Sequence, residues 1–145
     1  MLRYPNKRLA LALFPAALLL LTGCGGGNAN CGDISGAVKL DGKPLEQGSI
    51  LFTPMQGTSG SVTGGTIENG RYKFSGATAP AIGWNRVEIR AMRKTGKKIP
   101  KPFAPPGQTV DEQIEAIPPP FNSQSNLKVE VKHGENTADF DVSSH

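Results

Sequence analysis

From residue 34 onward, apolar and polar residues alternate in short runs that are separated by glycine and proline. In the first run Ile34, Val38 and Leu40 share one face, whereas Ser35 and Lys39 share the other. A period of two is typical of half-buried strands. No helix of any length is needed to account for this part of the chain, so the sequence predicts an all-β fold.

Hairpin turns are indicated by two dipeptides that tolerate positive φ angles, Asp41-Gly42 and Asn69-Gly70. Strands are predicted over residues 34–40, 48–54, 71–74 and 84–93, with a weaker one over 61–67. In the strand over 84–93, Val87 and Ile89 are expected to face the core, and Glu88 is expected to face water between two arginines.

Residues 127–131 and 138–142 alternate in the same way on either side of residues 133–136, which predicts a final hairpin. The segment 94–125 is rich in proline and has no sustained periodicity, so it is predicted to be a long surface loop, with one or two helical turns over 111–117. Six or seven short strands with Gly/Pro turns favour a single antiparallel β-sandwich of about seven strands, immunoglobulin-like or transthyretin-like.

The amino-terminal segment has basic residues at Arg3, Lys7 and Arg8, followed by an apolar run over 9–21. This run is shorter than the ~20 residues that span a bilayer, and it fits a signal peptide over 1–23. The next residues, Leu21-Thr22-Gly23-Cys24, resemble the lipobox of bacterial lipoproteins. The resemblance implies that Cys24 is acylated by lipid chains such as palmitate, and that the protein is anchored outside the cytoplasm on the cell membrane or outer membrane.

Most of the net positive charge of the chain belongs to this leader. The whole chain has a net charge of +4, but residues 24–145 have thirteen cations against twelve carboxylates, which does not indicate a nucleic-acid partner. Residues 24–32 are rich in glycine and are predicted to be a flexible tether. Within it, Cys31 is expected to be an exposed thiol, and the alternative is a disulfide that joins two copies of the chain.

The segment 36–45, followed by 48–54, resembles the opening of carboxypeptidase-regulatory-like domains. Residues 69–74 are similar to the next hairpin of that family, 87–91 to the strand that follows, and 117–127 to a segment of small lipoproteins built on this domain. The resemblance implies a transthyretin-like sandwich over residues 33–145. It also implies the non-catalytic companion of a peptidase, and the turn over 80–85 departs from the usual pattern of the family.

Candidate catalytic residues are few. His133 is predicted to lie in a turn and His145 ends the sequence, and neither belongs to a recognisable catalytic motif. The sequence therefore predicts no enzyme and no cofactor. Asp139 and Asp141 share one strand face and offer carboxylate oxygens of the kind that bind calcium, but a solvated strand face accounts for them better.

The strongest candidate site is a basic run that continues from the long strand into the loop. Its members, with the single tryptophan beside them, are Trp84, Arg86, Arg90, Arg93, Lys94, Lys97, Lys98 and Lys101. Such a run is able to contact lipid headgroups, an acidic polymer or an acidic protein, but a solvated strand edge accounts for it better. Trp84 with Phe103 and Phe121 suggests a platform that stacks on sugars, or aromatic residues that hold the loop on the sandwich.

These observations predict a non-enzymatic, membrane-anchored interaction or structural module of the cell envelope, with an unknown envelope protein or polysaccharide as partner. The alternative is a module that binds cell-wall glycans.

Overall fold

The computed structural model describes residues 30–145, and all structural statements below refer to this part of the chain. The predicted signal peptide, the lipobox and Cys24 lie outside the described residues. Within them the strands are β1 (Asp33–Leu40), β2 (Lys43–Pro44), β3 (Gln47–Pro54), β4 (Thr63–Glu68), β5 (Arg71–Phe74), β6 (Gly83–Arg90), β7 (Met92–Pro100), β8 (Thr109–Glu115), β9 (Lys128–Val131), β10 (Glu135–Thr137) and β11 (Phe140–Val142). Two 3-10 turns, η1 (Gly76–Thr78) and η2 (Pro119–Phe121), complete the element order.

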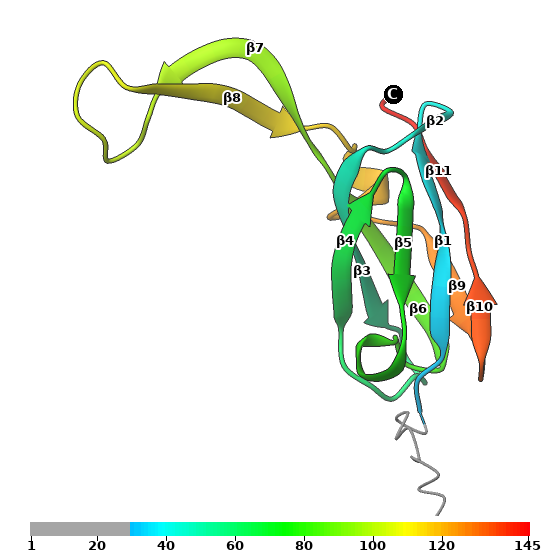
Figure 1. Ribbon diagram of the computed structural model, residues 1–145. Helices are drawn as coiled ribbons and strands as arrows, with labels where there is room; N and C mark the ends of the chain where they lie inside the picture. Colours follow the sequence, from blue (N-terminus) through cyan, green and yellow to red (C-terminus); the bar gives the residue numbers. More distant parts are fainter. Residues whose placement is uncertain (1–29) are drawn as a thin grey trace, which may run out of the picture.

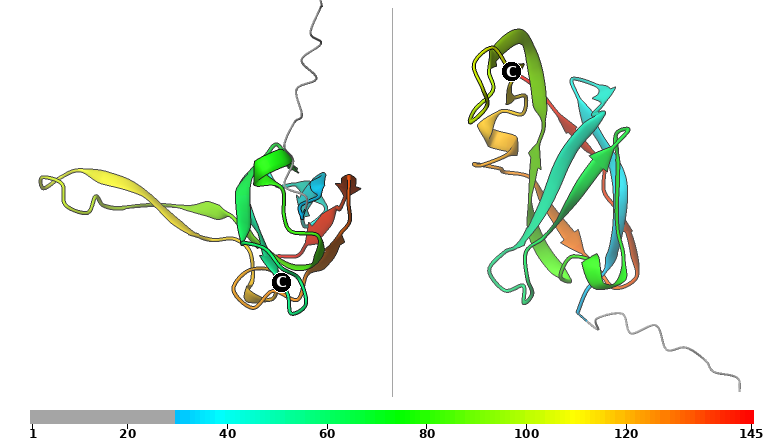
Figure 2. Two further views of the ribbon diagram at one scale, coloured as in Figure 1. Left: turned by 90° about the horizontal axis from the view of Figure 1, so that it is seen from below. Right: turned by 60° about the vertical axis from the view of Figure 1, so that its left-hand side comes forward.

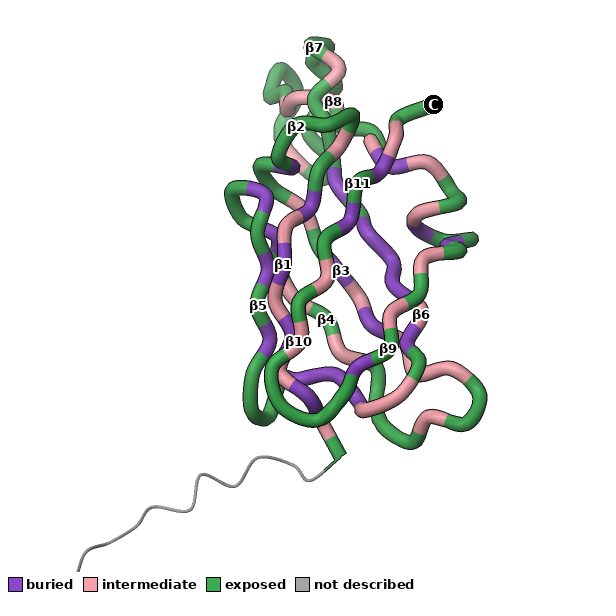
Figure 3. The backbone as a smooth tube through the Cα atoms, turned by 90° about the vertical axis from the view of Figure 1, so that its right-hand side faces the viewer, coloured by how far each residue is buried: buried purple, intermediate pink, exposed green. Residues whose placement is uncertain are grey.

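Most of these strands belong to one curled sheet. Its strand order is β10-β1-β5-β4-β3-β6-β9, and β2 and β11 also pair with β1. The sheet folds over on itself, so that β1 and β10 face β6 and β9 across the core (Figures 1 and 3). The predicted all-β sandwich of about seven strands is confirmed. The strands β7 and β8 form a separate two-stranded ribbon.

Both predicted hairpin turns are present. Asp41 and Gly42 have φ angles of 52° and 77°, and Asn69 and Gly70 have 51° and 71°. A tight turn with two consecutive positive φ angles matches the twist of the strands that it joins. The turns therefore fix which residues of β1 and β2, and of β4 and β5, lie opposite each other.

The core follows the predicted alternation. Ile34 and Val38 of β1 are buried, as are Tyr72 and Phe74 of β5, whereas Ser35, Ala37 and Lys73 are more exposed. Phe52 of β3 is fully buried, and its ring lies 5.4 Å from that of Phe74 in an edge-to-face arrangement. Aromatic pairs of this geometry add to the stability that comes from apolar burial.

The backbone of β1 lies very close to the backbone of residue 138. A Cβ atom on Gly36 would lie 1.8 Å from the carbonyl oxygen of Ala138, so this position requires glycine. The hydroxyl of Tyr72 donates to the same carbonyl at 2.7 Å. Burial raises the pKa of Tyr72, with a smaller contribution from the carboxylate of Asp139, so the phenol stays a donor.

The predicted final hairpin is wrong. β9 pairs with β6, whereas β10 and β11 pair with β1 in parallel, so residues 132–134 carry the chain from one side of the sandwich to the other. The side chain of Asn136 holds this crossing, because it accepts from the N–H of Lys132 at 2.9 Å and donates to the carbonyl of Asp33 at 3.0 Å. The expected alternation of buried residues still holds, with Val131, Phe140 and Val142 buried.

The predicted loop over 94–125 is also wrong over its first part. Residues 92–100 and 109–115 are paired strands, so the expected helical turns over 111–117 are instead the end of β8. The strand expected over 84–93 is divided as well: β6 ends at Arg90 and the ribbon begins at Met92. The buried residue between them, Ala91, marks the point where the chain leaves the sandwich.

The last residues of the predicted tether lie against the sandwich. Cys31 and Ala81 form an antiparallel bridge, and the N–H of Gly32 donates to the carbonyl of Pro80 at 3.1 Å. A Cβ on Gly32 would lie 2.1 Å from the carbonyl oxygen of Lys132. Cys31 is a free, half-buried cysteine, which is less accessible than the exposed thiol that was expected.

Candidate functional site

The ribbon of β7 and β8 extends well beyond the sandwich, as two views show (Figures 1 and 2). It leaves from the end of the sandwich opposite to the start of β1. Nearly all residues of β7 are exposed, and β7 and β8 pair with each other and with no other strand of residues 30–145. The ribbon is therefore highly accessible, and it includes most of the predicted cations.

An irregularity in the ribbon brings two lysines to one carboxylate. The pairing shifts between Lys94, opposite Gln113, and Lys98, opposite Asp111. As a result the Nζ atoms of Lys94 and Lys98 lie 2.8 and 2.5 Å from the two carboxylate oxygens of Asp111. The hydrogen bond from Lys94, followed by that from Lys98, lowers the pKa of Asp111 to about 2, and the same contact raises the pKa of Lys94.

The two faces of the ribbon differ in character. Residues that lie directly opposite each other in a ladder share a face. The pair Ile99 and Val110 therefore lies on the face opposite to Lys98 and Asp111. Ile114 lies on the same face across from Arg93, with Glu112 between Val110 and Ile114, and Ile99 and Ile114 are 37% and 38% exposed. Exposed apolar side chains that lie beside charged ones and that nothing in residues 30–145 covers are a feature of interaction surfaces.

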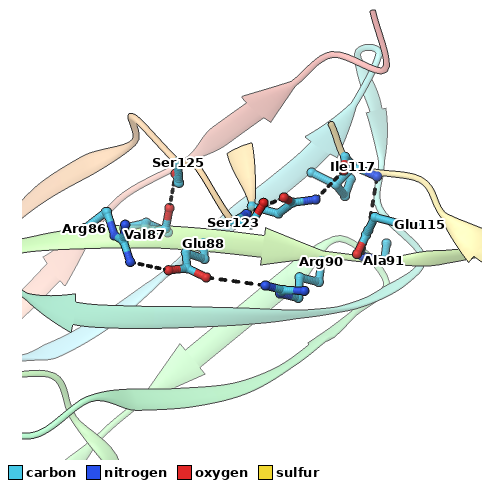
Figure 4. Close-up of polar contacts among 10 residues, drawn as sticks. Arg86, Val87, Glu88, Arg90, Ala91, Glu115, Ile117, Ser123 and Ser125 are labelled. Carbon is cyan, nitrogen blue, oxygen red and sulfur yellow. Dashed lines mark hydrogen bonds and ion pairs between the residues drawn. The ribbon is translucent and has the colours of Figure 1, made fainter. Parts of the chain in front are cut away.

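The root of the ribbon is held by a single carboxylate. Glu115 Oε1 accepts from the N–H of Ala91 at 3.0 Å and from the N–H of Ile117 at 3.2 Å (Figure 4). The N–H of Ala116 also donates to the carbonyl of Ala91 at 2.8 Å. Because Ala91 and Ile117 are buried in the core, these bonds join the exposed ribbon to the rigid part of the molecule.

The segment after the ribbon packs beside β6. The Asn122 side chain donates to the carbonyl of Ile117 at 2.5 Å, and the hydroxyl of Ser125 donates to the carbonyl of Val87 (Figure 4). Asn122 and Ser125 are both buried. This part of the predicted loop is therefore built into the sandwich and differs from the projecting ribbon.

Glu88 was expected to face water, and it is instead only 8% exposed. Its carboxylate lies 2.5 Å from Arg86 Nη2 and 3.8 Å from Arg90 Nη2 (Figure 4). A carboxylate at this degree of burial requires a positive partner. The pattern of Arg, Glu and Arg at every second residue of a strand is the signal in the sequence that predicts this arrangement.

The structure thus divides the predicted basic run into two groups. Arg86 and Arg90 belong to the sandwich and flank Glu88. The other five lie on the ribbon or in its tip: Arg93, Lys94, Lys97, Lys98 and Lys101. Within residues 30–145 the salt bridges of the ribbon involve Lys94 and Lys98 alone, which leaves the other three cations without an acidic partner there.

The three aromatic residues do not form one platform. Trp84 is 51% exposed at the start of β6, and Phe103 is fully exposed at the tip of the ribbon. Phe121 packs against the core cluster, and it is the one member of the three that holds its segment on the sandwich. Trp84 is positioned by its backbone, whose carbonyl accepts from the N–H of Met55 and the hydroxyl of Thr58.

A hollow of about 890 Å³ lies where the ribbon, the segment 116–123 and the carboxyl-terminal residues meet. Arg90, Arg93, Glu115 and His145 contribute to its lining. Asp41, which also lines the hollow, is engaged by Ser144, whose N–H and hydroxyl donate at 2.9 and 2.7 Å and lower the pKa of the carboxyl group. Sequence reasoning did not identify this hollow.

The other candidate residues have structural contacts. Asp139 accepts from the N–H of Ala37 at 2.7 Å and Asp141 from the N–H of Gly42 at 3.3 Å, so both carboxylates bind backbone of β1 and its turn. His133 lies exposed between β9 and β10. The described residues include no group of three potential metal ligands. Among residues 30–145 no helix is long and apolar enough to cross a membrane.

Comparison with known proteins gives little. No family model matches the chain, and no curated protein matches it. Among solved structures, a 9R-lipoxygenase from Cyanothece PCC8801 aligns with a TM-score of 0.34 at 16% identity. The alignment covers 79% of this chain and 16% of that one, so the chain spans a small part of the length of the lipoxygenase.

Proposed function

We propose that this protein is a non-enzymatic interaction module of the bacterial cell envelope that is anchored through Cys24 and presents the β7–β8 ribbon to a partner. The observation that carries the proposal is the ribbon itself. A two-stranded ribbon is marginally stable alone in water. This one nevertheless extends away from the core with Ile99, Ile114 and Phe103 exposed, which favours a partner that covers it.

The attachment of the ribbon supports the same function. Glu115 joins the base of the ribbon to buried residues of the sandwich, so a partner that binds the ribbon is held on the rigid core. Anchoring through Cys24 rests on the resemblance of residues 21–24 to the lipobox. One lipid chain holds a protein weakly on a membrane, whereas two or three chains hold it stably.

The test is a site-specific cross-link in intact cells with the full chain. A photo-reactive residue replaces Gln108 at the exposed tip of the ribbon or, as the matched control, Lys73 on an exposed position of β5. We expect a discrete adduct from position 108 that is absent from position 73. Equal labelling from both positions, or none from position 108, would contradict a docking function for the ribbon. Loss of lipid from a Cys24→Ser variant tests the anchor separately.

A second candidate function, glycan binding, is favoured by the exposure of Trp84. An indole ring that is 51% exposed offers a flat surface on which a sugar ring can stack. Co-sedimentation with insoluble cell-wall polysaccharide tests this function. We expect binding to be lost in Trp84→Ala and kept in Phe103→Ala if the sandwich binds glycan, and the reverse if the ribbon does.

A further inference from the structure

The tip of the ribbon has an unusual combination of residues. Between Ile99 and Gln108 the chain includes one charged residue, Lys101, and four prolines. At the turn Phe103 is fully exposed, with a relative exposure of 110%. This large aromatic side chain lies at the far end of a projecting ribbon. Its exposure to water is unfavourable in free energy, and no apolar contact reduces that exposure.

The backbone of the tip holds Phe103 in this position. The N–H of Lys101 donates to the carbonyl of Gln108 at 2.9 Å, and the N–H of Ala104 donates to the carbonyl of Lys101 at 3.3 Å. Phe103 has a φ angle of 58°, a left-handed conformation that a bulky residue rarely adopts. Such strain persists where the surrounding structure imposes it, and it is concentrated at sites of function.

The backbone of the tip also has few free N–H donors. Of the nine residues 100–108, four are prolines without an N–H group. Three further N–H groups, those of Lys101, Ala104 and Gln108, are bonded within the tip. An unpaired N–H is costly in an apolar environment. The backbone of the tip is therefore suited to an apolar surface, whereas the side chain of Lys101 still requires a polar partner.

Cations surround the base of this apolar tip. From residue 89 to residue 110 the sequence has no acidic residue. Asp111 engages Lys94 and Lys98, whereas Lys97 and Lys101 make no salt bridge within residues 30–145. An apolar side chain at the turn, with Lys101 two residues before it and Lys97 further back on β7, matches the layers of a lipid surface, where anionic headgroups lie above the acyl chains.

We infer that the tip of the ribbon, residues 99–108, inserts into the surface of a bilayer that contains anionic lipids. Phe103 enters the boundary of the acyl chains, and Lys97 and Lys101 contact the headgroups. This inference rests on the proposed function, because it takes the ribbon as the interaction surface and names its partner as lipid. The ribbon and the start of β1 lie at opposite ends of the sandwich, so the contact is separate from anchoring through Cys24.

The experiment uses residues 30–145, which include the core cluster of the described part of the chain, and circular dichroism first confirms that they fold. The chain is mixed with vesicles of phosphatidylcholine alone or with added phosphatidylglycerol, and binding is measured by flotation. We expect binding to the anionic vesicles that weakens with added salt. Phe103→Ser should lower the affinity about tenfold or more, because the insertion of one aromatic side chain is lost.

Matched controls separate the tip from the rest of the surface. Val62→Ser removes another exposed apolar side chain, and Lys73→Glu makes on β5 the same change of charge as Lys101→Glu makes at the tip. We expect Lys101→Glu to weaken binding roughly tenfold and both controls to bind as the parent chain does. Circular dichroism confirms that each variant is folded.

Fluorescence reports insertion directly. In a Trp84→Phe background, Phe103→Trp should shift its emission to shorter wavelength when anionic vesicles are added, whereas Trp84 of the parent chain should not shift. Equal binding by the parent chain and Phe103→Ser, or a shift at Trp84 alone, would overturn the inference. A folded chain that binds no vesicle, yet still gives the position-108 adduct with an envelope protein in cells, would overturn the lipid partner and leave the proposed function standing.

Discussion

The sandwich and the ribbon are made of the same element, the β-strand, and differ in what the strands do with their apolar residues. In the sandwich Ile50 and Phe52 of β3 point into a core where they are 1% and 0% exposed. In the ribbon Ile99 and Ile114 share a face that nothing in residues 30–145 covers. The sandwich is stabilised by its apolar core, and the ribbon by hydrogen bonds and ion pairs between its two strands.

This difference assigns separate roles to the two regions. Elements with few buried apolar contacts open at low free energy, and binding segments are commonly drawn from them. The sandwich supplies stability, and the ribbon supplies accessible side chains at a distance from it. The bonds of Glu115 to Ala91 and Ile117 are the joint between the two.

The same substitution in the two regions should have very different effects. Ile50→Ala removes a buried side chain from β3 and should lower the free energy of unfolding by about 2–5 kcal/mol. Ile99→Ala makes the same chemical change on the ribbon and should change it by less than about 0.5 kcal/mol. Denaturant unfolding of both variants measures this contrast. A loss of similar size at position 99 would mean that the ribbon packs against the sandwich in solution.

The part of the fold that depends on local sequence could be predicted. The turns at Asp41-Gly42 and Asn69-Gly70 require only the conformations that these dipeptides favour. Likewise, the burial of Tyr72 and Phe74 follows from alternation within β5. Such features depend on residues that are neighbours in the chain.

Which strands pair depends on residues far apart in the sequence, and here prediction failed. Residues 133–136 were interpreted as a hairpin turn, but the Asn136 side chain binds Asp33, some hundred residues away. β10 and β11 therefore pair with β1 instead of returning to β9. Nothing in the local alternation distinguishes these two outcomes.

The sequence predicted the basic residues of the candidate site but not the two-stranded ribbon on which most of them lie. The basic residues were identified, but the shifted pairing between Lys94 and Lys98 breaks the period of two on which strand prediction depends. Their partner Asp111 lies on the other strand of the ribbon, so the ion pairs were not apparent. The prolines near the tip also favoured the prediction of an irregular loop.

A second way to sharpen the comparison is to add one methyl group to the sandwich. Gly36→Ala places a Cβ against the carbonyl of Ala138, where backbone must move to admit it. We expect a loss of about 1–3 kcal/mol in the free energy of unfolding, as for other overpacked sites. Thermal unfolding measures it, with Ser35→Ala, on the neighbouring and more exposed position of β1, as the control. An unchanged melting temperature would contradict the close approach of residue 138 to β1.

The joint between the two regions can be weakened without touching either core or tip. Glu115→Ala removes the acceptor of the Ala91 and Ile117 N–H groups. We expect a loss of about 1 kcal/mol in stability, the usual net contribution of hydrogen bonds. Faster amide exchange should appear at residues 91–93 and 114–117 and not in β3 or β4. Gln113→Ala, a substitution at an exposed position of β8, is the control. If exchange rises across the sandwich as well, the ribbon is part of one cooperative unit with it.

The smallest effect concerns the ion pairs of the ribbon, which are exposed to water. The pKa of Asp111 is lowered from its ordinary value of 3.8 to about 2 by Lys94 and Lys98. A carboxyl group whose pKa is lower in the folded chain stabilises the fold above its unfolded pKa, and this contribution is lost as the pH falls toward 2. Cross-strand contacts within the ribbon should therefore weaken between about pH 4 and 2. The cross-strand contacts of the buried sandwich should not change over this range.

NMR titration of the Asp111 carboxyl carbon measures this directly. Lys94→Gln should raise its pKa toward 3.8, because the hydrogen bond from Lys94 is the largest cause of the shift, and Lys98 should keep the pKa below 3.8. Lys97→Gln, which removes a cation that makes no salt bridge within residues 30–145, should leave it nearly unchanged. If Asp111 titrates at its ordinary value in the parent chain, the two strands are not held together by these pairs. The stability of the ribbon in isolation would then depend on its backbone hydrogen bonds and on the hydrogen bond from Thr95 to Glu112, and its need for a partner would be greater.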